Sequence, residues 1–256
     1  MCSGGGKSGV SPGDLPILAM NPKVWLRRDG ITKTGSAVDS INGLYATAGH
    51  VFLPLGNKAQ VSTDGPLAVI APAPSGECRY KSQKPTSWWT WTQRSHTIVW
   101  VSNSGDASSD VGFLGEGTNP DPQWHHGMYH TVGTPYYLGG FAYIGGTGQE
   151  PRAPRPSTGA TGYPNMMTVD ATLPQATRAV MYPGANTPVA GPTTLPTVVA
   201  PNGMSMLIFG TPAPQYNRRA WSECIMWDRV ISAAERAALS AYLNSRYAPY
   251  YQAVSW

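Results

Sequence analysis

The chain has 256 residues, a formal net charge of +4, and only 12% of its residues are charged. Its 29 Gly and 24 Pro are typical of a protein with many turns and few exposed helices. All six Lys precede residue 85 and no block of like charge appears, so we expect no nucleic-acid footprint.

Three cysteines, Cys2, Cys78 and Cys224, cannot supply the disulfide framework of a small secreted domain. We therefore expect Cys78 and Cys224 to stay reduced. The first residues lack a basic segment followed by an apolar one, so no secretory signal is predicted. No apolar run reaches the length of a membrane span. These features predict a protein that is made in a cytoplasm and stays soluble there or is assembled there.

Residues 1–14 form a Gly-rich segment that we interpret as a flexible N-terminal arm. Gly6, Lys7 and Ser8 match the end of a phosphate-binding loop, but that motif needs a further Gly where this chain has Met1. A free arm of this kind frays. We therefore predict that a neighbouring subunit holds it, with Cys2 and Lys7 among the assembly contacts.

Residues 15–115 read as short strands between turns. Turn chemistry occurs at Asn42-Gly43, Asp64-Gly65, Ser75-Gly76 and Ser104-Gly105. The predicted strands are Leu15–Leu26, Val51–Leu55, Leu67–Ile70, Ser87–Trp91, His96–Val101 and Val111–Leu114. Their regular spacing favours an antiparallel sandwich.

Residues 117–200 differ because they contain no Lys and many Pro and Gly. Only Tyr136–Ile144 and Thr177–Met181 have a strand-like pattern. Loops this long within a compact domain are usually functional or bound to a partner. We therefore interpret the region as an elaborated insertion, after which residues 204–210 return to a strand.

The C-terminal part changes from strand to helix. Residues 221–228 alternate, with Trp221, Glu223, Ile225 and Trp227 predicted on one face and Ser222, Cys224, Met226 and Asp228 on the other. Apolar groups on both faces predict an interior strand. Ser232 and Glu235 then form a capping box that begins a helix, which Pro249 ends. The helix places Leu239, Tyr242 and Leu243 on one stripe, with Arg236 and Arg246 left to water.

This C-terminal stretch resembles the closing signature of the laminin-G-like, concanavalin A-like jelly rolls. The matching positions are Glu223, Ile225, Asp228, Arg229, Ile231, Ser232, Glu235, Tyr242, Leu243, Arg246 and Tyr247. Near the start, residues 24–29 (VWLRRD) resemble the family's opening strand. Residues 38–43 (VDSING) resemble its following turn, with Val38 where Trp is common and Ile41 inserted.

The resemblance implies an all-β fold: an antiparallel β-sandwich jelly roll with one short C-terminal α-helix and long Pro/Gly-rich loops. It implies one domain over residues 15–250, with the insertion at about 117–200 and an aromatic tail at 251–256. It says little about activity, because this fold hosts lectins, glycosidases, adhesion modules and virus structural parts.

A retaining glycosidase on this fold needs two carboxylates spaced Glu-x-Asp-x-x-Glu, and the chain has no such set. The nearest pair, Glu223 and Asp228, faces opposite sides of a strand about 16 Å apart. No nucleophile elbow or activated Cys is present either. We therefore predict no enzyme, no catalytic residue and no cofactor.

Two weak metal patterns remain beside simpler interpretations. His125 or His126 with His130 could ligate a metal, but an intervening Gly argues against a helix, and loop hydrogen bonding or stacking is the alternative. Asp106 and Asp110 could contribute to a Ca²⁺ site, but two carboxylates rarely suffice, and turn solvation is the alternative. We predict no metal site.

Aromatic residues are the most suggestive feature, since exposed Trp and Tyr stack on sugars and anchor interfaces. The predicted glycan or partner contacts are Trp88, Trp89, Trp91, Trp124, Tyr136 and Tyr137, with core packing as the alternative for each. The tail contains Tyr250, Tyr251 and Trp256, which we predict to dock on this domain or to join the assembly contacts.

Two functions follow. The main prediction is a non-enzymatic bacteriophage virion protein, such as a capsid decoration protein, head fibre or tail appendage. It would assemble in the host cytoplasm with other virion proteins and copies of itself, as a homo-oligomer, through its arm and loops. The alternative is a carbohydrate-binding or receptor-binding module that recognises a cell-surface glycan through exposed Trp and Tyr. Neither function involves nucleic acid or a membrane span.

Overall fold

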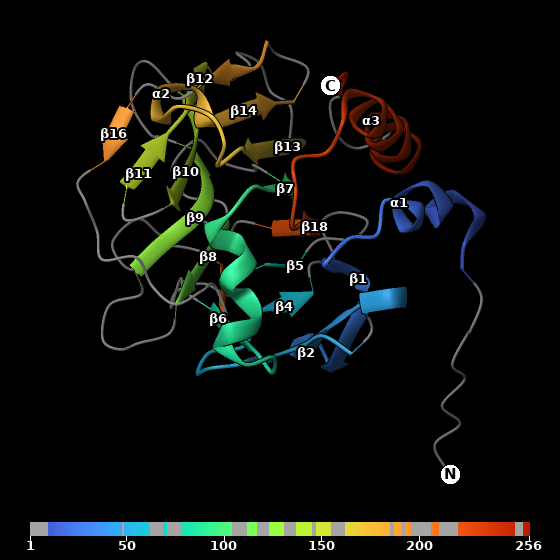
Figure 1. The fold of residues 1–256 in the computed structure, drawn as a ribbon. Helices are drawn as coiled ribbons and strands as arrows, with labels where there is room; N and C mark the ends of the chain where they lie inside the picture. Colours follow the sequence, from blue (N-terminus) through green and yellow to red (C-terminus); the bar gives the residue numbers. More distant parts are fainter. Residues whose placement is uncertain are drawn as a thin grey trace.

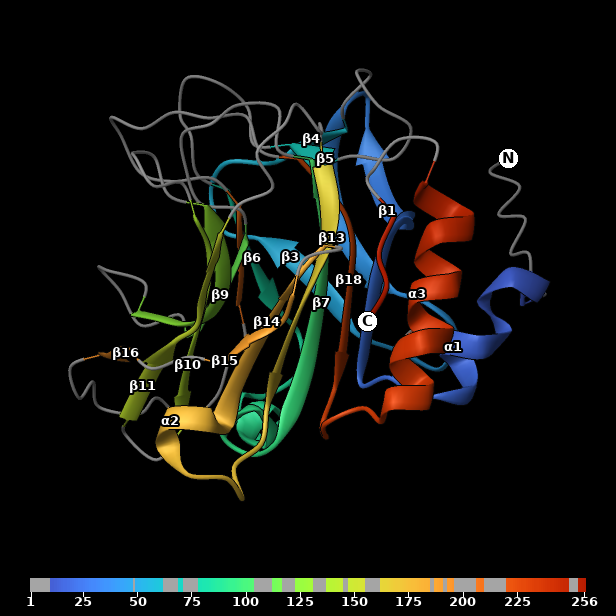
Figure 2. The ribbon, with the colours of Figure 1, turned by 90° about the horizontal axis from the view of Figure 1, so that it is seen from above.

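The computed structural model shows an antiparallel β-sandwich with helices packed on one face. It describes residues 10–47, 49–61, 69–70, 78–103, 112–116, 123–130, 137–144, 147–154, 162–184, 187–190, 193–195, 206–209, 220–248 and 253–256. Figure 1 shows the fold, and Figure 2 shows its three layers: helices α1 and α3, the sheet beside them, and a second sheet farther away.

The helix-side sheet lies under α1 and α3. Its order is β15 (Val189–Ala190), β14 (Ala179–Pro183), β13 (Gly162–Val169), β7 (His96–Asn103), β18 (Ala220–Trp227), β1 (Val24–Thr34) and β2 (Ala37–Gly43). Every one of these pairings is antiparallel. The strand before the closing helix, β18, lies between β7 and β1, so the predicted interior strand is confirmed.

The outer sheet continues from β2 through β3, so the two sheets join at one corner. Its order is β3 (Val51–Pro54), β6 (Cys78–Ser82), β17 (Met206–Phe209), β8 (Gly112–Glu116), β9 (Gln123–His130) and β10 (Tyr137–Ile144). Both β11 (Thr147–Glu150) and β12 (Arg152–Pro154) pair with β10, and β16 (Thr193–Leu195) pairs with β11. Two short strands, β4 (Gln60–Val61) and β5 (Val69–Ile70), link β2 to β18.

Alternation along the central strands divides the core into two layers. On β18, Cys224 and Met226 pack between the sheets, whereas Ile225 and Trp227 pack toward the helices. The same two-residue period occurs on β1 and β7, since successive side chains of a strand face opposite sides. The predicted fold class, an antiparallel sandwich with a C-terminal helix, is confirmed.

The face predicted for Trp221 is wrong. Its partner on β7 is Ser102, and the next paired residue, Glu223, faces Val101, so Ser222 is an extra residue in a β-bulge. The bulge turns Trp221 to the layer between the sheets, where its ring lies 5.8 Å from that of Trp100.

The closing helix, α3 (Ala233–Tyr247), begins as predicted. Glu235 N donates to Ser232 Oγ and Ser232 N donates to the Glu235 carboxylate, which completes the capping box. Leu239, Tyr242 and Leu243 are buried against the sheet. Among the described residues, α3 is the longest helix with 15 residues, and no helix is long and apolar enough to span a membrane.

The predicted strand Leu15–Leu26 is wrong over its first half. Residues Pro12–Asp14 form 3-10 helix η1 and Leu15–Ala19 form α1, and each helix has Pro in its first turn. Proline has no N–H and a fixed φ, which suits the start of a helix. Strand β1 begins only at Val24.

The predicted turn at residues 38–43 is also wrong, because these residues belong to β2. The chain reverses instead at Gly35, whose φ of 61° is the left-handed conformation that glycine adopts without a steric penalty. Val38 and Ile41 are buried between the sheets as strand residues.

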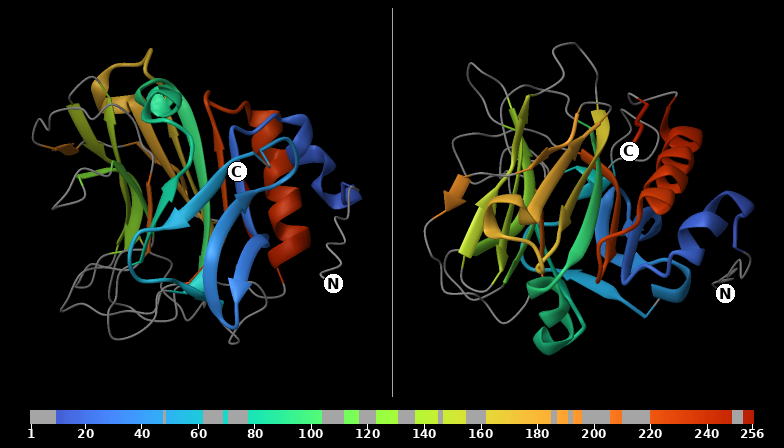
Figure 3. Two further views of the ribbon diagram at one scale, coloured as in Figure 1. Left: turned by 90° about the horizontal axis from the view of Figure 1, so that it is seen from below. Right: turned by 45° about the horizontal axis from the view of Figure 1, so that its top comes forward.

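The predicted strand Ser87–Trp91 is a helix. Residues Thr86–Gln93 form 3-10 helix η3 directly after Pro85, and η3 closes one end of the sandwich (Figure 3). Residues three apart share a face of a 3-10 helix, and the ring centroids of Trp88 and Trp91 lie 6.0 Å apart. Another 3-10 helix, η2 (Tyr45–Thr47), follows β2.

The region 117–200 contributes more strands than predicted. Strand β13 joins the helix-side sheet between β7 and β14, and its Met166, Met167 and Val169 are buried. This strand was not predicted because it contains Pro164 and Asn165, and Pro argues against an interior strand. The predicted strand Thr177–Met181 is partly helical, because α2 (Gln175–Arg178) precedes β14. The proposed domain boundaries remain predictions.

The tail docks on its own domain, as one of the two predicted outcomes. Asn244 exchanges two 2.8 Å hydrogen bonds with the backbone of Val254, which is buried. Trp256 N donates to Ser240 Oγ at 3.0 Å. The other predicted assembly contacts, Cys2, Lys7, Tyr250 and Tyr251, lie outside the described residues.

Removing the α3 cap tests this boundary. We expect Ser232→Ala to lower the free energy of unfolding by about 1 kcal/mol, because Glu235 N loses its acceptor. Urea denaturation measures the change. The matched control is Ser245→Ala on the same helix, whose hydroxyl donates to Tyr242 O rather than capping an N–H. Equal effects of the two variants would contradict the assigned cap.

Candidate functional site

An aromatic cluster surrounds η3 at one end of the sandwich. It consists of Trp88, Trp89 and Trp91 with His50 and Phe52, and its ring centroids lie 4.6–6.0 Å apart. Trp89 is fully buried between the sheets, while Trp88 and Trp91 are partly buried against the same core. The core interpretation therefore holds for Trp89, and only Trp88 and Trp91 retain surface for a ligand.

His50 is buried within this cluster. Its Nε2 lies 2.8 Å from Ser82 Oγ, which also accepts a hydrogen bond from Lys84 N at 3.0 Å. Burial, with a smaller contribution from the Lys84 charge, lowers the pKa of His50 to about 4. Ser82 is itself only 3% exposed, so this His–Ser pair cannot reach a substrate and acts as a packing element.

His96 is fully buried at the start of β7. Its Nδ1 lies 2.7 Å from Arg94 O, and since a carbonyl only accepts, Nδ1 carries the proton. Burial lowers the pKa of His96 to about 4, although the contact with Arg94 O favours the charged form. Both histidines are therefore neutral at pH 7.

The structure does not gather the six predicted aromatic contacts. Trp124 lies near the start of β9, whereas Tyr137 begins β10, which pairs with the other end of β9 through His130 and Leu138. The rise of a strand puts about 20 Å between these two backbone positions. Tyr136 lies outside the described residues.

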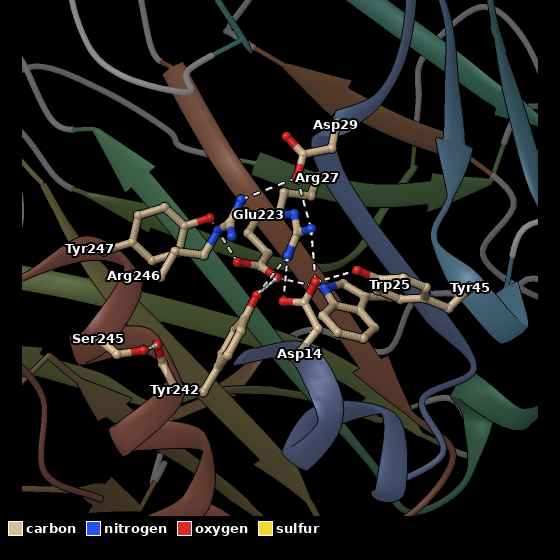
Figure 4. A network of polar contacts seen from close by, with 10 residues as sticks. All are labelled: Asp14, Trp25, Arg27, Asp29, Tyr45, Glu223, Tyr242, Ser245, Arg246 and Tyr247. Carbon is tan, nitrogen blue, oxygen red and sulfur yellow. Dashed lines mark hydrogen bonds and ion pairs between the residues drawn. The ribbon is translucent and has the colours of Figure 1, made fainter. Parts of the chain in front are cut away.

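A buried polar network lies between the helix-side sheet and the helices, centred on Glu223 (Figure 4). Its carboxylate accepts hydrogen bonds from Trp25 Nε1, Tyr242 Oη and Tyr247 Oη, the two tyrosine bonds being 2.7 Å long. The acceptor is on β18, and its donors come from β1 and α3. One carboxylate thus ties the closing helix to two strands.

Arg27 extends the network to α1. Its guanidinium donates to both oxygens of Asp14, at 2.8 and 3.1 Å, and Tyr45 Oη also donates to Asp14. Asp29 accepts from Arg27 at 2.7 Å and from Arg246 at 3.2 Å. The network thereby holds the N-terminal and C-terminal helices on one sheet.

Burial dominates the electrostatics of this network. It raises the pKa of Glu223, and the Arg27 charge and the hydroxyl donors oppose that rise. Burial also acts to raise the pKa of Asp14, but the hydrogen bonds from Arg27 and Tyr45 lower it below its ordinary value. Glu223, Arg27 and Asp14 are closed to solvent and both of these carboxylates are engaged, so this part of the network is structural.

Several residues of the C-terminal stretch that resembles the jelly-roll signature make structural contacts. Arg229 donates to Glu235 and, at 3.1 Å, to Met20 O, which links the start of α3 to α1. Asp228 is 40% exposed and binds Lys23 at 3.1 Å. Asp228 thus lies at the protein surface while Glu223 is buried, so the two carboxylates have different surroundings.

No metal centre is formed within the part of the chain that the structure describes, where no three His, Cys, Asp or Glu side chains converge. Asp106 and Asp110 lie outside that part. The backbone of His125, His126 and His130 belongs to β9, a strand rather than a loop. The thiols of Cys78 and Cys224 are reduced and buried, and burial raises the pKa of Cys224.

Known proteins share this fold but not this sequence. No model of a known protein family matches the chain, and no curated protein is similar to it. Trypanosoma rangeli sialidase in complex with sialic acid has a TM-score of 0.53 and 12% identity, with 87% of this chain and 33% of the sialidase covered. The same sialidase with a difluoro-KDN ligand gives a TM-score of 0.54 at 12% identity, covering 87% of this chain and 32% of the sialidase.

The binding domain of botulinum neurotoxin DC is also similar. Its complex with SialylT gives a TM-score of 0.53 at 10% identity, covering 88% of this chain and 51% of that domain. Its complex with rat synaptotagmin II gives a TM-score of 0.53 at 10% identity, covering 89% of this chain and 52% of that domain. This chain thus spans about a third of the sialidase and about half of the toxin domain. At these identities the likeness establishes a β-sandwich fold.

The Glu223 network makes a quantitative prediction. We expect Glu223→Ala to cost about 3–5 kcal/mol, because it leaves three hydrogen-bond donors buried without their acceptor and removes a buried negative charge that faces Arg27. Asp228→Ala, which removes a surface carboxylate five residues away, should cost less than about 1 kcal/mol. Denaturant midpoints and slopes of both variants test the difference. Similar losses in the two would show that the network does not stabilise the fold.

The buried histidines predict acid sensitivity. The pKa values of His50 and His96 are about 4 in the fold, whereas an unfolded His titrates near 6.5. Between these values the unfolded chain binds more protons, so stability falls as the pH is lowered from about 6.5 toward 4. Each His contributes at most about 1.4 kcal/mol per pH unit.

Urea unfolding between pH 7 and 4.5 measures this slope. The double variant His50→Gln/His96→Asn keeps an amide near each hydrogen-bonding nitrogen but cannot titrate. We expect it to show a flatter pH dependence than the wild type. An unchanged slope would show that other groups cause the acid sensitivity.

Proposed function

We propose that this chain is a non-enzymatic β-sandwich module that binds glycans. The observation that carries the proposal is the fold likeness to two unrelated kinds of protein. One was solved with sialic acid and the other with SialylT. Those ligands belong to those proteins, and their bearing on this chain comes through the shared fold alone. A sandwich without a catalytic dyad is a common support for sugar recognition.

The absence of catalysis is part of the proposal. Most retaining glycosidases use two accessible carboxyl groups about 5–5.5 Å apart, although sialidases use a Tyr nucleophile instead. In the described part, Glu223 is sealed in its network, and Asp14, Asp29 and Glu235 bind arginines. This arrangement supports a binding module rather than a hydrolase.

The virion assembly function remains a prediction, as do the virion location and the homo-oligomer. The sialidase and toxin structures give it no support. Its proposed arm lies mainly outside the described residues, and Trp256 is engaged by its own domain. The glycan-binding function is therefore the better supported of the two.

An array of mammalian and bacterial glycans tests this function. We expect the folded protein to bind at least one sugar class saturably, with binding lost after thermal denaturation. Isothermal titration with the best hit then measures the affinity and stoichiometry. Absence of binding across the whole array, with a folded protein confirmed by circular dichroism, would overturn the proposal.

A further inference from the structure

The outer sheet has a face that neither α1 nor α3 covers (Figure 2). On β6, Tyr80 and Ser82 are buried, so Arg79 and Lys81 lie on the outward face of the sheet. Lys81 is exposed, and its partner on β3, Leu53, is 39% exposed. Solvent therefore reaches this face where β3 and β6 run side by side.

The register of the strands extends this outward face across the sheet. Residues that are opposite each other in an antiparallel pair share a face. Lys81 is opposite Met206 on β17, which is opposite Gly115 on β8. The same pairing, continued through β9 to β10, gives the aromatic positions of the outward face: Phe113, Trp124, Tyr129, Tyr137, Phe141 and Tyr143.

The outward face has a basic end and an aromatic end. Arg79 and Lys81 are both on β6, whereas the aromatic positions are on β8, β9 and β10. Three strand spacings, about 14 Å, separate β6 from β9. In the described strands β3, β6, β17, β8, β9 and β10, no Asp or Glu occupies this face. A complementary ligand therefore has a negative charge at one end and uncharged rings along the rest.

Glycines accompany the aromatic positions of this face. Gly127 is opposite Phe141, and Gly139 is opposite Tyr129. Glycine within a strand weakens the sheet, and it commonly marks a place where a ligand or another backbone approaches closely. The missing Cβ at each glycine leaves room beside the aromatic position for a sugar ring.

The size of the face distinguishes a small ligand from a protein. Six strands span about 24 Å, and the positions from Trp124 to Tyr129 span about 17 Å along β9. The face therefore measures about 400 Å², whereas each partner of a standard protein interface contributes about 800 Å². These dimensions favour an oligosaccharide over a second copy of this chain or another protein.

We propose that the outward face of β3, β6, β17, β8, β9 and β10 binds a sialylated oligosaccharide, which has a single acidic sugar at its end. The terminal carboxylate binds at Arg79 and Lys81, and the neutral sugars that follow pack over the aromatic positions of β9 and β10. A polyuronate, which is charged along its whole length, does not match the uncharged end. The assignment rests on the proposed glycan-binding function and specifies its ligand class and site.

Titration calorimetry of the full chain compares 3′-sialyllactose with two other sugars. Lactose lacks the acidic sugar, and trigalacturonate is charged on every sugar. We expect both to bind at least tenfold more weakly than sialyllactose. Equally tight binding of either one would overturn the assignment of a single acidic end.

Variants at the two ends of the face should differ in their effects. Lys81→Gln, at an exposed position, should weaken sialyllactose binding at least threefold and leave lactose binding unchanged. Phe141→Leu, which keeps an apolar side chain but removes the ring, should weaken the binding of both sugars. The matched control, Lys33→Gln, removes an equal charge from an exposed position on β1 and should bind as the wild type does.

The outcomes separate the two proposals. If the wild type and the Lys81 and Phe141 variants bind sialyllactose equally well, the face assignment is wrong while glycan binding stands. Binding of polyglutamate as tightly as sialyllactose would show that the face takes an acidic protein, which also overturns the assignment. No binding to any glycan would overturn both proposals. Thermal unfolding of each variant confirms that lost binding does not reflect lost folding.

Discussion

The buried carboxylate of Glu223 constrains the rest of the helix-covered face. A charge removed from water must be matched by donors and counter-charges, or the fold loses several kcal/mol. Here the donors come from β1 and α3, and the counter-charge, Arg27, is held in turn by Asp14 beside α1. Two helices at opposite ends of the sequence are thereby fixed on one sheet. The apolar layer of Ile225, Trp227 and Leu239 excludes water around them.

Local patterns predicted those parts of the fold that local physics determines. The alternation along β18 and the capping box of Ser232 and Glu235 each have one structural solution, and both are present. The prediction of a strand over the Trp-rich segment of η3 was wrong. Aromatic content favours a strand, whereas Pro85 and the position at the end of the sandwich favour a helical turn. The face predicted for Trp221 was wrong because the bulge at Ser222 depends on pairing with another strand, which the sequence of β18 alone does not show.

The candidate sites were predictable only where their residues are neighbours in sequence. Trp88, Trp89 and Trp91 do lie together, but the sequence could not show that Trp89 is sealed in the core. The contact of Arg236 with Tyr182 was missed because the two residues are 54 positions apart, and that of Trp256 with Ser240 because the tail doubles back on α3. Likewise, Trp25 and Glu223 are separated by 198 residues. Only tertiary structure creates such pairs.

The buried network and the capping box hold the closing helix α3 at its two ends. Tyr242 and Tyr247 anchor the last turns of this helix on Glu223, and the capping box and Arg229 anchor its first turn. Arg236 and Ser240 lie between these anchors, and their side chains contact Tyr182 and the backbone of Trp256. Loosening the Glu223 network would therefore release the last turns of α3 first, while the capping box still holds its first turn.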